Sequence, residues 1–229
     1  AAVAAGSSQD ESADGADYLL EELWANPAAV GLGVDVCPWA RLQSATTRWR
    51  GRAERIFSER ELDEFQDALA IPWAAREAVL KALGLPSILG APLAQMNIER
   101  LKERKGLRYA PTGTALQLLH ERGVSVTLRS WLLEDVAIVL ATCEDATVVR
   151  AGHCAIRAER TTGDLSLGAR RTAERAARSA ADSAGITVAD GVWSGGRNQA
   201  AHWSGVPNAL VSLSHDAGVV VGAALLAVA

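Results

Sequence analysis

The sequence contains few of the residues that mark several common protein classes. Its three cysteines form no C-x-x-C pair, which argues against a disulfide framework and against a zinc site. No run approaches the ~20 apolar residues that a membrane-spanning helix needs. Aromatic residues make up 5% of the chain, and none of the common nucleic-acid recognition motifs is present. Hydrophobic residues still reach 49%, so we expect a folded cytoplasmic protein that binds neither membranes nor nucleic acid.

Negative charge is concentrated at the start of the chain. The net charge is −4, but residues 1–30 contain six acids and no base, which leaves the remainder slightly basic. Residues 1–17 are small and acidic, a composition that predicts a disordered linker. The only methionine is Met96. We therefore expect a domain of a larger protein, with a shortened form of a longer chain as the alternative.

Positive charge is concentrated in one short stretch. Five arginines fall within fifteen residues that contain a single acid, Glu54: Arg41, Arg48, Arg50, Arg52 and Arg55. Arg41, Arg48 and Arg55 recur every seven residues, which places them near one face of a helix. Such a patch is either a solvated helix face or a docking surface for an acidic partner.

Apolar periodicity and capping residues predict helices and strands in the first part of the chain. Residues 18–25 fit a short amphipathic helix, and residues 30–36 fit a buried strand. Ser58 and Glu61 form a capping box that opens a helix over 59–69. Pro72 lies in the first turn of a longer helix that ends at Gly84.

The rest of the chain shows one pattern twice. A hairpin over 97–110, a helix over 112–123 and strands over 124–130 and 135–142 come first. A strand over 148–159, an alanine-rich helix over 167–185 and two strands after residue 208 follow. Each part ends in two strands around a short turn. We therefore expect an α+β fold of two related halves, 18–142 and 143–229, each with a small antiparallel sheet packed on a long helix.

Three short motifs contain groups suited to phosphate or metal chemistry. Residues 33–35 (GVD) place an acid at the end of a buried strand. Glu77 and Lys81 are four residues apart in the segment 73–81 (WAAREAVLK), hence on one face of a helix. Residues 212–216 (SLSHD) end a strand with a histidine. Each motif alone has an ordinary explanation as a turn-forming acid, a surface ion pair or a structural histidine.

Together and in this order, the motifs resemble the 4′-phosphopantetheinyl transferase superfamily, in particular its holo-acyl-carrier-protein synthase branch. That family shows G-[VI]-D, then W-x-x-K-E-A-x-x-K, and near its end S-[LI]-S-H. The resemblance extends through RIFSERELDEF and through IERLKERKGLRYAPTGTALQLLHERGVSV, and it covers about residues 30–142 and the last twenty. Arg76 departs from the pattern, because the family usually has lysine there.

The resemblance implies the transfer of 4′-phosphopantetheine from coenzyme A to a serine of an acyl carrier protein, releasing adenosine 3′,5′-bisphosphate. It implies that Asp35 and Glu77 hold Mg²⁺, which favours oxygen ligands and often takes only one or two carboxylates. Lys81 would neutralise the diphosphate or the leaving group. Either Glu77 or a water on the metal would be the base for the serine hydroxyl.

The resemblance also implies which residues bind coenzyme A. His215, with Ser212 and Ser214, would bind one of its phosphates, and Arg76 would contribute charge. Gly84 would let the backbone approach the phosphates. For the two serines, the alternative is that their hydroxyls cap backbone groups at the end of the strand.

The motifs are divided between the two halves. Where the first half should carry the histidine motif it reads TLRSW at 127–131, and the second half has neither G-[VI]-D nor W-x-x-K-E-A. In family members built from one small repeat, the coenzyme A site lies between neighbouring subunits. We therefore expect a monomer with one intrachain site, in which Asp35 and Glu77 meet His215.

An acyl carrier protein is the partner that the resemblance implies for the arginine patch. Carrier proteins are acidic along the helix after their modified serine, and the family docks that helix with basic residues in this region. Arg41, Arg48 and Arg55 are the expected docking residues. A polyketide synthase that carries this domain at its C-terminus is the expected context. The alternative function is a catalytically idle carrier-protein-binding module of the same fold.

Overall fold

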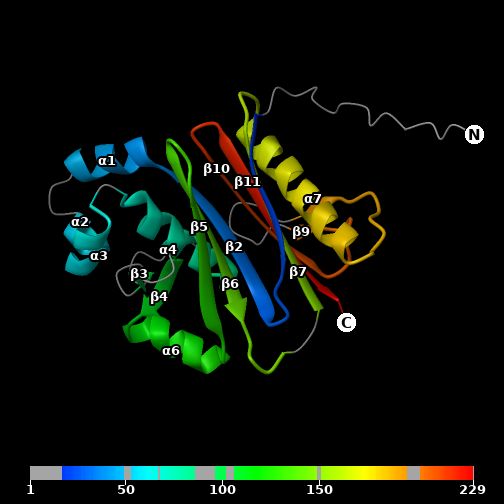
Figure 1. Cartoon of the computed structure of the whole chain (residues 1–229), viewed down its shortest axis with the longest axis horizontal. Coiled ribbons are helices and arrows are strands. Elements are labelled where there is room, and N and C mark those ends of the chain that lie inside the picture. Colours follow the sequence, from blue (N-terminus) through cyan, green and yellow to red (C-terminus); the bar gives the residue numbers. More distant parts are fainter. Residues whose placement is uncertain are drawn as a thin grey trace, which may run out of the picture.

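The computed structural model describes residues 17–48, 53–66, 68–85, 96–101, 106–148, 151–194 and 202–228. Figure 1 shows strands in the middle of the molecule, with α4 on one side and α7 on the other. Most of the strands belong to two antiparallel sheets, with the strand orders β2-β6-β5-β4-β3 and β1-β7-β11-β10. No helix in the described part is long and apolar enough to cross a membrane.

The first half contains the five-stranded sheet and most of the helices. Its strands are β2 (Ala29–Pro38), β3 (Met96–Leu101), β4 (Gly106–Pro111), β5 (Ser125–Leu132) and β6 (Val136–Glu144). Its helices are α1 (Trp39–Arg48), α2 (Ala53–Ile56), α3 (Glu59–Glu64), α4 (Ala70–Ala82) and α6 (Gly113–Arg122). The predicted capping box at Ser58 is confirmed, although α3 ends earlier than predicted.

The second half forms three strands of a four-stranded sheet, which β1 completes, and one long helix. The strands of this sheet are β1 (Asp17–Ala25), β7 (Ala151–Arg160), β10 (Ala209–Asp216) and β11 (Val219–Val228), and the helix is α7 (Leu165–Ser183). The short strands β8 (Trp193–Ser194) and β9 (His202–Trp203) pair with each other. The predicted strands and the alanine-rich helix of this half are confirmed.

The two halves repeat one arrangement. In the first, the strand order β2-β6-β5 is combined with α4, and in the second, β7-β11-β10 is combined with α7. The hairpin β5–β6 therefore corresponds to the hairpin β10–β11. The prediction of an α+β fold from two related halves is confirmed.

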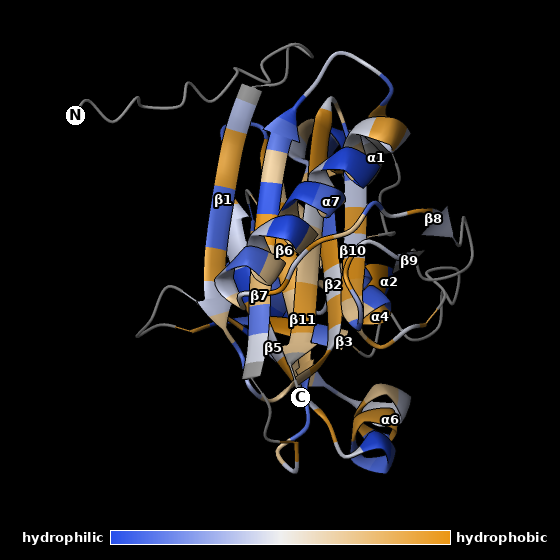
Figure 2. Ribbon diagram, turned by 90° about the vertical axis from the view of Figure 1, so that its right-hand side faces the viewer, coloured by the Kyte–Doolittle hydropathy of each residue, from blue (hydrophilic) through white to orange (hydrophobic). Residues whose placement is uncertain are grey.

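Alternation along the strands divides the interior into layers. Leu32, Val34 and Val36 of β2 point into a core that they share with residues of β7 and β11 from the other sheet. Cys37, one residue on, points to the opposite core, which α4 fills with alanine, valine and leucine. Ala155 and Ala224 likewise face α7. The two sheets thus pack face to face between α4 and α7. Figure 2 shows hydrophilic residues over much of the outer surface of α7.

The prediction of a helix over residues 18–25 is wrong. These residues form β1, which pairs antiparallel with β7 from Asp17 opposite Arg160 to Ala25 opposite His153. The sequence YLLEELWA fits both a helical and a strand period over so short a window, and the free edge of β7 decides in favour of the strand. Pairing also places residues 17–25 in the second sheet, although the sequence grouped 18–25 with the first half.

Gly33 allows the closest approach between β2 and α4. A Cβ atom built at this position would lie 2.0 Å from the carbonyl oxygen of Ala78 and 2.5 Å from the amide nitrogen of Ala82. Both contacts are with backbone, which cannot rotate away as a side chain can. The glycine of the GVD motif is therefore required for packing, one pleat before Asp35.

We expect Gly33→Ala to lower the free energy of unfolding by about 1–3 kcal/mol, because α4 must move away from β2. Chemical denaturation measures this change. Gly163→Ala is the matched control, since its Cβ would meet only Thr161 Oγ1 at 3.6 Å, and the change expected there is below about 1 kcal/mol. Equal stability of Gly33→Ala and the parent protein would contradict the packing argument.

Candidate functional site

The candidate site lies where the edges of the two sheets meet. β2 is the edge strand of one sheet and β10 is the edge strand of the other. The amide of Val34 donates to Ser212 Oγ at 2.9 Å, and the amide of Val36 donates to Ser214 Oγ at 3.4 Å. Serine side chains thus satisfy backbone donors that a neighbouring strand would otherwise pair. The backbone-capping interpretation of these two buried serines is the one the geometry supports.

Asp35 accepts hydrogen bonds from both halves of the chain. Ser214 Oγ donates to Asp35 Oδ1 at 2.9 Å, and Lys81 Nζ donates to the same oxygen at 2.9 Å. Asp35 lies on β2, Lys81 on α4 and Ser214 on β10. The carboxylate is therefore held in one orientation by a hydroxyl from the second half and an ammonium group from the first.

Lys81 connects the two sheet edges directly. Besides Asp35, its ammonium group donates to the carbonyl oxygen of Val34 at 2.8 Å and to that of Leu213 at 3.4 Å. Three acceptors use all three N–H groups of the lysine. A residue predicted for catalysis is thus also a clamp between β2 and β10.

Glu77 lies one helical turn before Lys81 and is half-buried. Burial raises the pKa of its carboxyl group, the charge of Asp35 raises it further, and Lys81 and Arg41 partly offset these effects. Among the described residues, none donates a hydrogen bond to this carboxylate. Two neighbouring acids, one of them without a hydrogen-bond donor, form a pair that a cation would stabilise.

The donor chemistry of this pair fits Mg²⁺. Carboxylate oxygens are its preferred protein ligands, and it often takes one or two of them together with phosphates and waters. The described residues contain no group of three histidine, cysteine or acidic side chains that could hold a metal. Asp35 and Glu77 are therefore the protein ligands that this site could offer, and a phosphate-containing ligand would have to complete the set.

His215 lies on β10 between two residues that contact the first half. Ser214 donates to Asp35, and Asp216 forms an ion pair with Arg41 of α1. His215 itself is exposed, and its ring has no hydrogen-bond partner among the residues that the structure describes. His215 thus lies between two residues of β10 that contact the first half, and its own side chain is exposed.

The prediction that Arg76 binds coenzyme A is corrected by its position. Its side chain is 0% exposed and forms an ion pair with Glu61, which is 1% exposed. A ligand in the seam cannot reach a guanidinium group buried in the core. Gly84 lies in a left-handed turn (φ 66°) and donates its amide to the Lys81 carbonyl oxygen, so its shown role is to end α4.

The described docking arginines lie on α1, which follows β2 directly, and on α2. The Arg41 side chain is 73% exposed although it contacts Asp216, and Arg55 of α2 is exposed. The side chain of Arg48, and residues 50 and 52, lie outside the described part. Sequence analysis missed Asp216, the partner of Arg41, although it directly follows the S-x-S-H motif.

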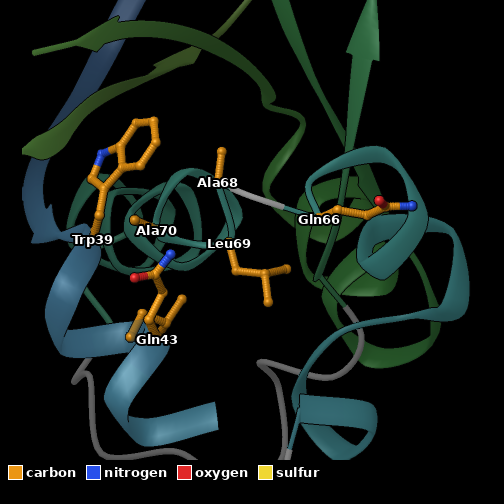
Figure 3. A pocket seen from close by; sticks show the side chains of 7 residues that line it. Trp39, Gln43, Gln66, Ala68, Leu69 and Ala70 are labelled. Atoms are coloured by element: carbon orange, nitrogen blue, oxygen red, sulfur yellow. The ribbon is translucent and has the colours of Figure 1, made fainter. Parts of the chain in front are cut away.

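A small cavity of about 50 Å³ lies beside these arginines. Trp39, Leu42 and Gln43 of α1 line one side of it, and Gln66 and residues 68–70 line the other. Figure 3 shows the side chains of Trp39 and Gln43 facing the same space as Leu69. Nε1 of Trp39 is buried and has no hydrogen-bond partner in the described part of the chain. The first half therefore offers a small hollow, lined by apolar side chains and two glutamines, beside the helix that contains Arg41.

The three cysteines are buried thiols. Burial raises the pKa of Cys37 to about 12, and the charge of nearby Asp35 adds to the effect. Cys143 and Cys154 behave in the same way. The raised pKa values favour the protonated thiols, which are poor nucleophiles.

The chain is similar to several known proteins. A family model described as the 4′-phosphopantetheinyl transferase superfamily matches residues 31–141. The holo-[acyl-carrier-protein] synthase of Beutenbergia cavernae is 32% identical over 108 residues, which cover 42% of this chain and 91% of that protein. The holo-[acyl-carrier-protein] synthase of Streptomyces avermitilis is 38% identical over 108 residues, 44% of this chain and 82% of that protein. Among solved structures, the holo-[acyl-carrier-protein] synthase from Neisseria meningitidis is 24% identical with a TM-score of 0.46, and the match covers 51% of this chain and 99% of that one.

The electrostatic coupling of Asp35 and Glu77 gives a pH test of the site. We expect Asp35→Asn to lower the pKa of Glu77, because the neighbouring negative charge disappears while burial remains. Carbon-13 NMR of the Glu77 carboxyl group over pH measures this shift. A divalent cation binds the ionised form of Glu77. As the pH is lowered, the affinity for the cation should therefore begin to fall at a higher pH than at a site with an ordinary glutamate. An unchanged pKa in Asp35→Asn would show that burial alone sets it.

Proposed function

We propose that this chain, which belongs to the 4′-phosphopantetheinyl transferase superfamily, transfers 4′-phosphopantetheine from coenzyme A to a serine of an acyl carrier protein in the cytoplasm. Adenosine 3′,5′-bisphosphate is the other product. The observation that carries the proposal is the cluster of Asp35, Glu77 and Lys81 at the seam beside the strand of His215. These are residues of the family motifs, and support for a site between the halves comes from the contact of Ser214 with Asp35.

The charges of the cluster suit a diphosphate bound together with Mg²⁺. Asp35 and Glu77 would hold the metal, which supplies charge neutralisation for the diphosphate. Lys81 lies against Asp35 and can offer an N–H to a phosphate oxygen in exchange for its long contact with Leu213. His215, exposed at the end of β10, is placed to bind a further phosphate of coenzyme A.

Glu77 is the group that we assign as the proton acceptor. The carrier serine oxygen forms a bond to the phosphorus that bears the pantetheine arm. The bond from that phosphorus to the bridging oxygen breaks, and its electron pair leaves with adenosine 3′,5′-bisphosphate. Glu77 takes the proton that the serine hydroxyl releases.

One chain is proposed to contain the whole site. Contacts from Ser214 to Asp35, from Lys81 to Leu213 and from Asp216 to Arg41 all join the two halves of a single chain. A second subunit is therefore not needed to complete the cluster, which supports a monomer. A domain within a polyketide synthase remains the expected context.

The carrier protein is proposed to dock on α1 and α2. The exposed arginines of these helices would attract the acidic helix of the carrier, and the cavity beside Trp39 would accept an apolar side chain from it. Surface charges of this kind mainly accelerate association, and salt weakens their effect.

A transfer assay tests the function itself. Incubation with apo carrier protein, coenzyme A and Mg²⁺ should add one phosphopantetheinyl group to the carrier, as mass spectrometry measures. We expect Glu77→Gln to reduce the rate by roughly 10²–10⁴-fold, because a metal ligand and proton acceptor is lost. Glu121→Gln, on the exposed face of α6, is the matched control and should keep the parent rate. Carrier binding without any mass gain by the parent protein would support the idle module instead.

Charge reversal tests the docking surface. We expect Arg55→Glu to raise the KM for carrier protein by roughly 3–10-fold and to leave the KM for coenzyme A unchanged, because the residue faces the partner and not the seam. Arg170→Glu on the exposed side of α7 is the matched control and should change neither constant. An increase in the KM for coenzyme A with Arg55→Glu would assign the patch to nucleotide binding.

A further inference from the structure

One buried carboxylate joins three elements around the candidate site. Glu61 Oε2 accepts from the Ser58 amide at 2.8 Å and from its hydroxyl at 3.0 Å, which closes the capping box of α3. Glu61 Oε1 accepts from the amide of Ile98 in β3 at 2.8 Å. Both oxygens accept from the guanidinium nitrogen Nη2 of Arg76, on α4, at 2.7 Å. The side chain that caps α3 is thus also the attachment point of β3 and α4.

Arg76 is fixed on its side of this contact by more than the ion pair. Its guanidinium nitrogen Nη1 donates to the carbonyl oxygen of Pro72 at 3.1 Å. The guanidinium group also lies over the ring of Phe57, 4.9 Å from the ring centre. Burial lowers the pKa of Arg76, and the charge of Glu61 opposes that change. A planar group with this many directed contacts tolerates little rotation of its helix.

Arg76 and Glu77 are consecutive residues on α4, and they point in different directions. Trp73, Glu77 and Lys81 are each four residues apart and share one face of the helix. Rotating α4 about its axis would move Glu77 and Lys81 along the seam relative to Asp35. A displacement of about 1 Å in a catalytic constellation can cost about 10²-fold in rate. The contact that fixes the rotation of α4 therefore fixes the geometry of the site.

We propose that Arg76 and Glu61 are positioning residues: their ion pair holds α4 in the rotation that brings Glu77 and Lys81 to Asp35, and it thereby sets the affinity for a divalent cation. The inference rests on the proposed function for the identity of the bound cation. It also explains the departure from the family pattern at residue 76, because the arginine is directed into the core and away from the ligand.

The test separates positioning from stability with two variants of the pair. Arg76→Met removes the cation and leaves Glu61 buried without its partner. The double variant Glu61→Gln/Arg76→Met removes both charges, and its single glutamine oxygen can accept either from Ser58 or from Ile98. We expect the double variant to recover part of the thermal stability that Arg76→Met loses. Both variants should bind Mn²⁺ about 3–10-fold more weakly than the parent protein in the presence of coenzyme A, as the electron paramagnetic resonance of free Mn²⁺ measures.

The control is a second buried acid–arginine pair outside the site. Glu159 of β7 is 5% exposed and accepts from Arg175 of α7 at 2.8 and 2.9 Å. Glu159→Gln should lower the melting temperature and leave Mn²⁺ binding unchanged. Parent-like Mn²⁺ binding by the double variant would overturn the inference, because the pair would then serve stability alone.

A readout that needs no metal distinguishes the inference from the proposed function. If α4 rotates, Glu77 moves away from Asp35, and its pKa should fall in the double variant and stay unchanged in Glu159→Gln. Carbon-13 NMR measures both shifts. Absence of Mn²⁺ binding by the parent protein would count against the proposed function, and the NMR comparison would still decide the positioning role. An unchanged Glu77 pKa in the double variant would overturn that role.

Discussion

The hydrogen-bonding requirement of two sheet edges is the constraint on which the rest of the structure depends. β2 and β10 each end a sheet, so each presents backbone groups that need partners. The hydroxyls of Ser212 and Ser214 satisfy the amides of β2, and Lys81 satisfies a carbonyl oxygen on each strand. Because side chains and not a ladder join the edges, polar groups remain in the seam. A continuous sheet at this place would have left no room for Asp35 to meet Lys81 and Ser214.

The two halves satisfy the equivalent edges in different ways. β7 corresponds to β2, but β7 is not an edge strand, because β1 pairs with it along its length. Glu159 faces α7 as Asp35 faces α4, yet its neighbours are the cations Arg157 and Arg175. In the described part of the second half, no second acid accompanies it in the way that Glu77 accompanies Asp35. The division of motifs in the sequence therefore corresponds to a structural asymmetry, in which the first half supplies the acids and the second supplies a strand.

Local signals in the sequence predicted most of the fold, and contacts between distant segments account for what they missed. The capping box at Ser58 and the αL glycine at Gly123 are determined by neighbouring residues, so the helices next to them could be predicted. β1 could not, because its apolar pattern fits either period until β7 offers an edge. The resemblance to the family grouped Asp35, Glu77 and Lys81 in one predicted site. It gave the position of Arg76 along α4 but not its direction into the core, which depends on Glu61 fifteen residues earlier.

The balance of charge in the seam determines how the proposed metal and diphosphate would affect each other's binding. Asp35 and Glu77 are negative, Lys81 is the cation in contact with Asp35, and Arg41 is paired with Asp216. These five side chains together carry one negative charge when all are ionised, which repels a diphosphate. A divalent cation bound by the two acids would reverse the sign of this charge and attract the diphosphate.

The diphosphate in turn would supply the oxygen ligands that two carboxylates cannot provide alone. Burial raises the pKa of Glu77, and the charge of Asp35, which is part of the same imbalance, raises it further. Metal and coenzyme A are therefore expected to bind cooperatively, because each removes the charge that opposes the other.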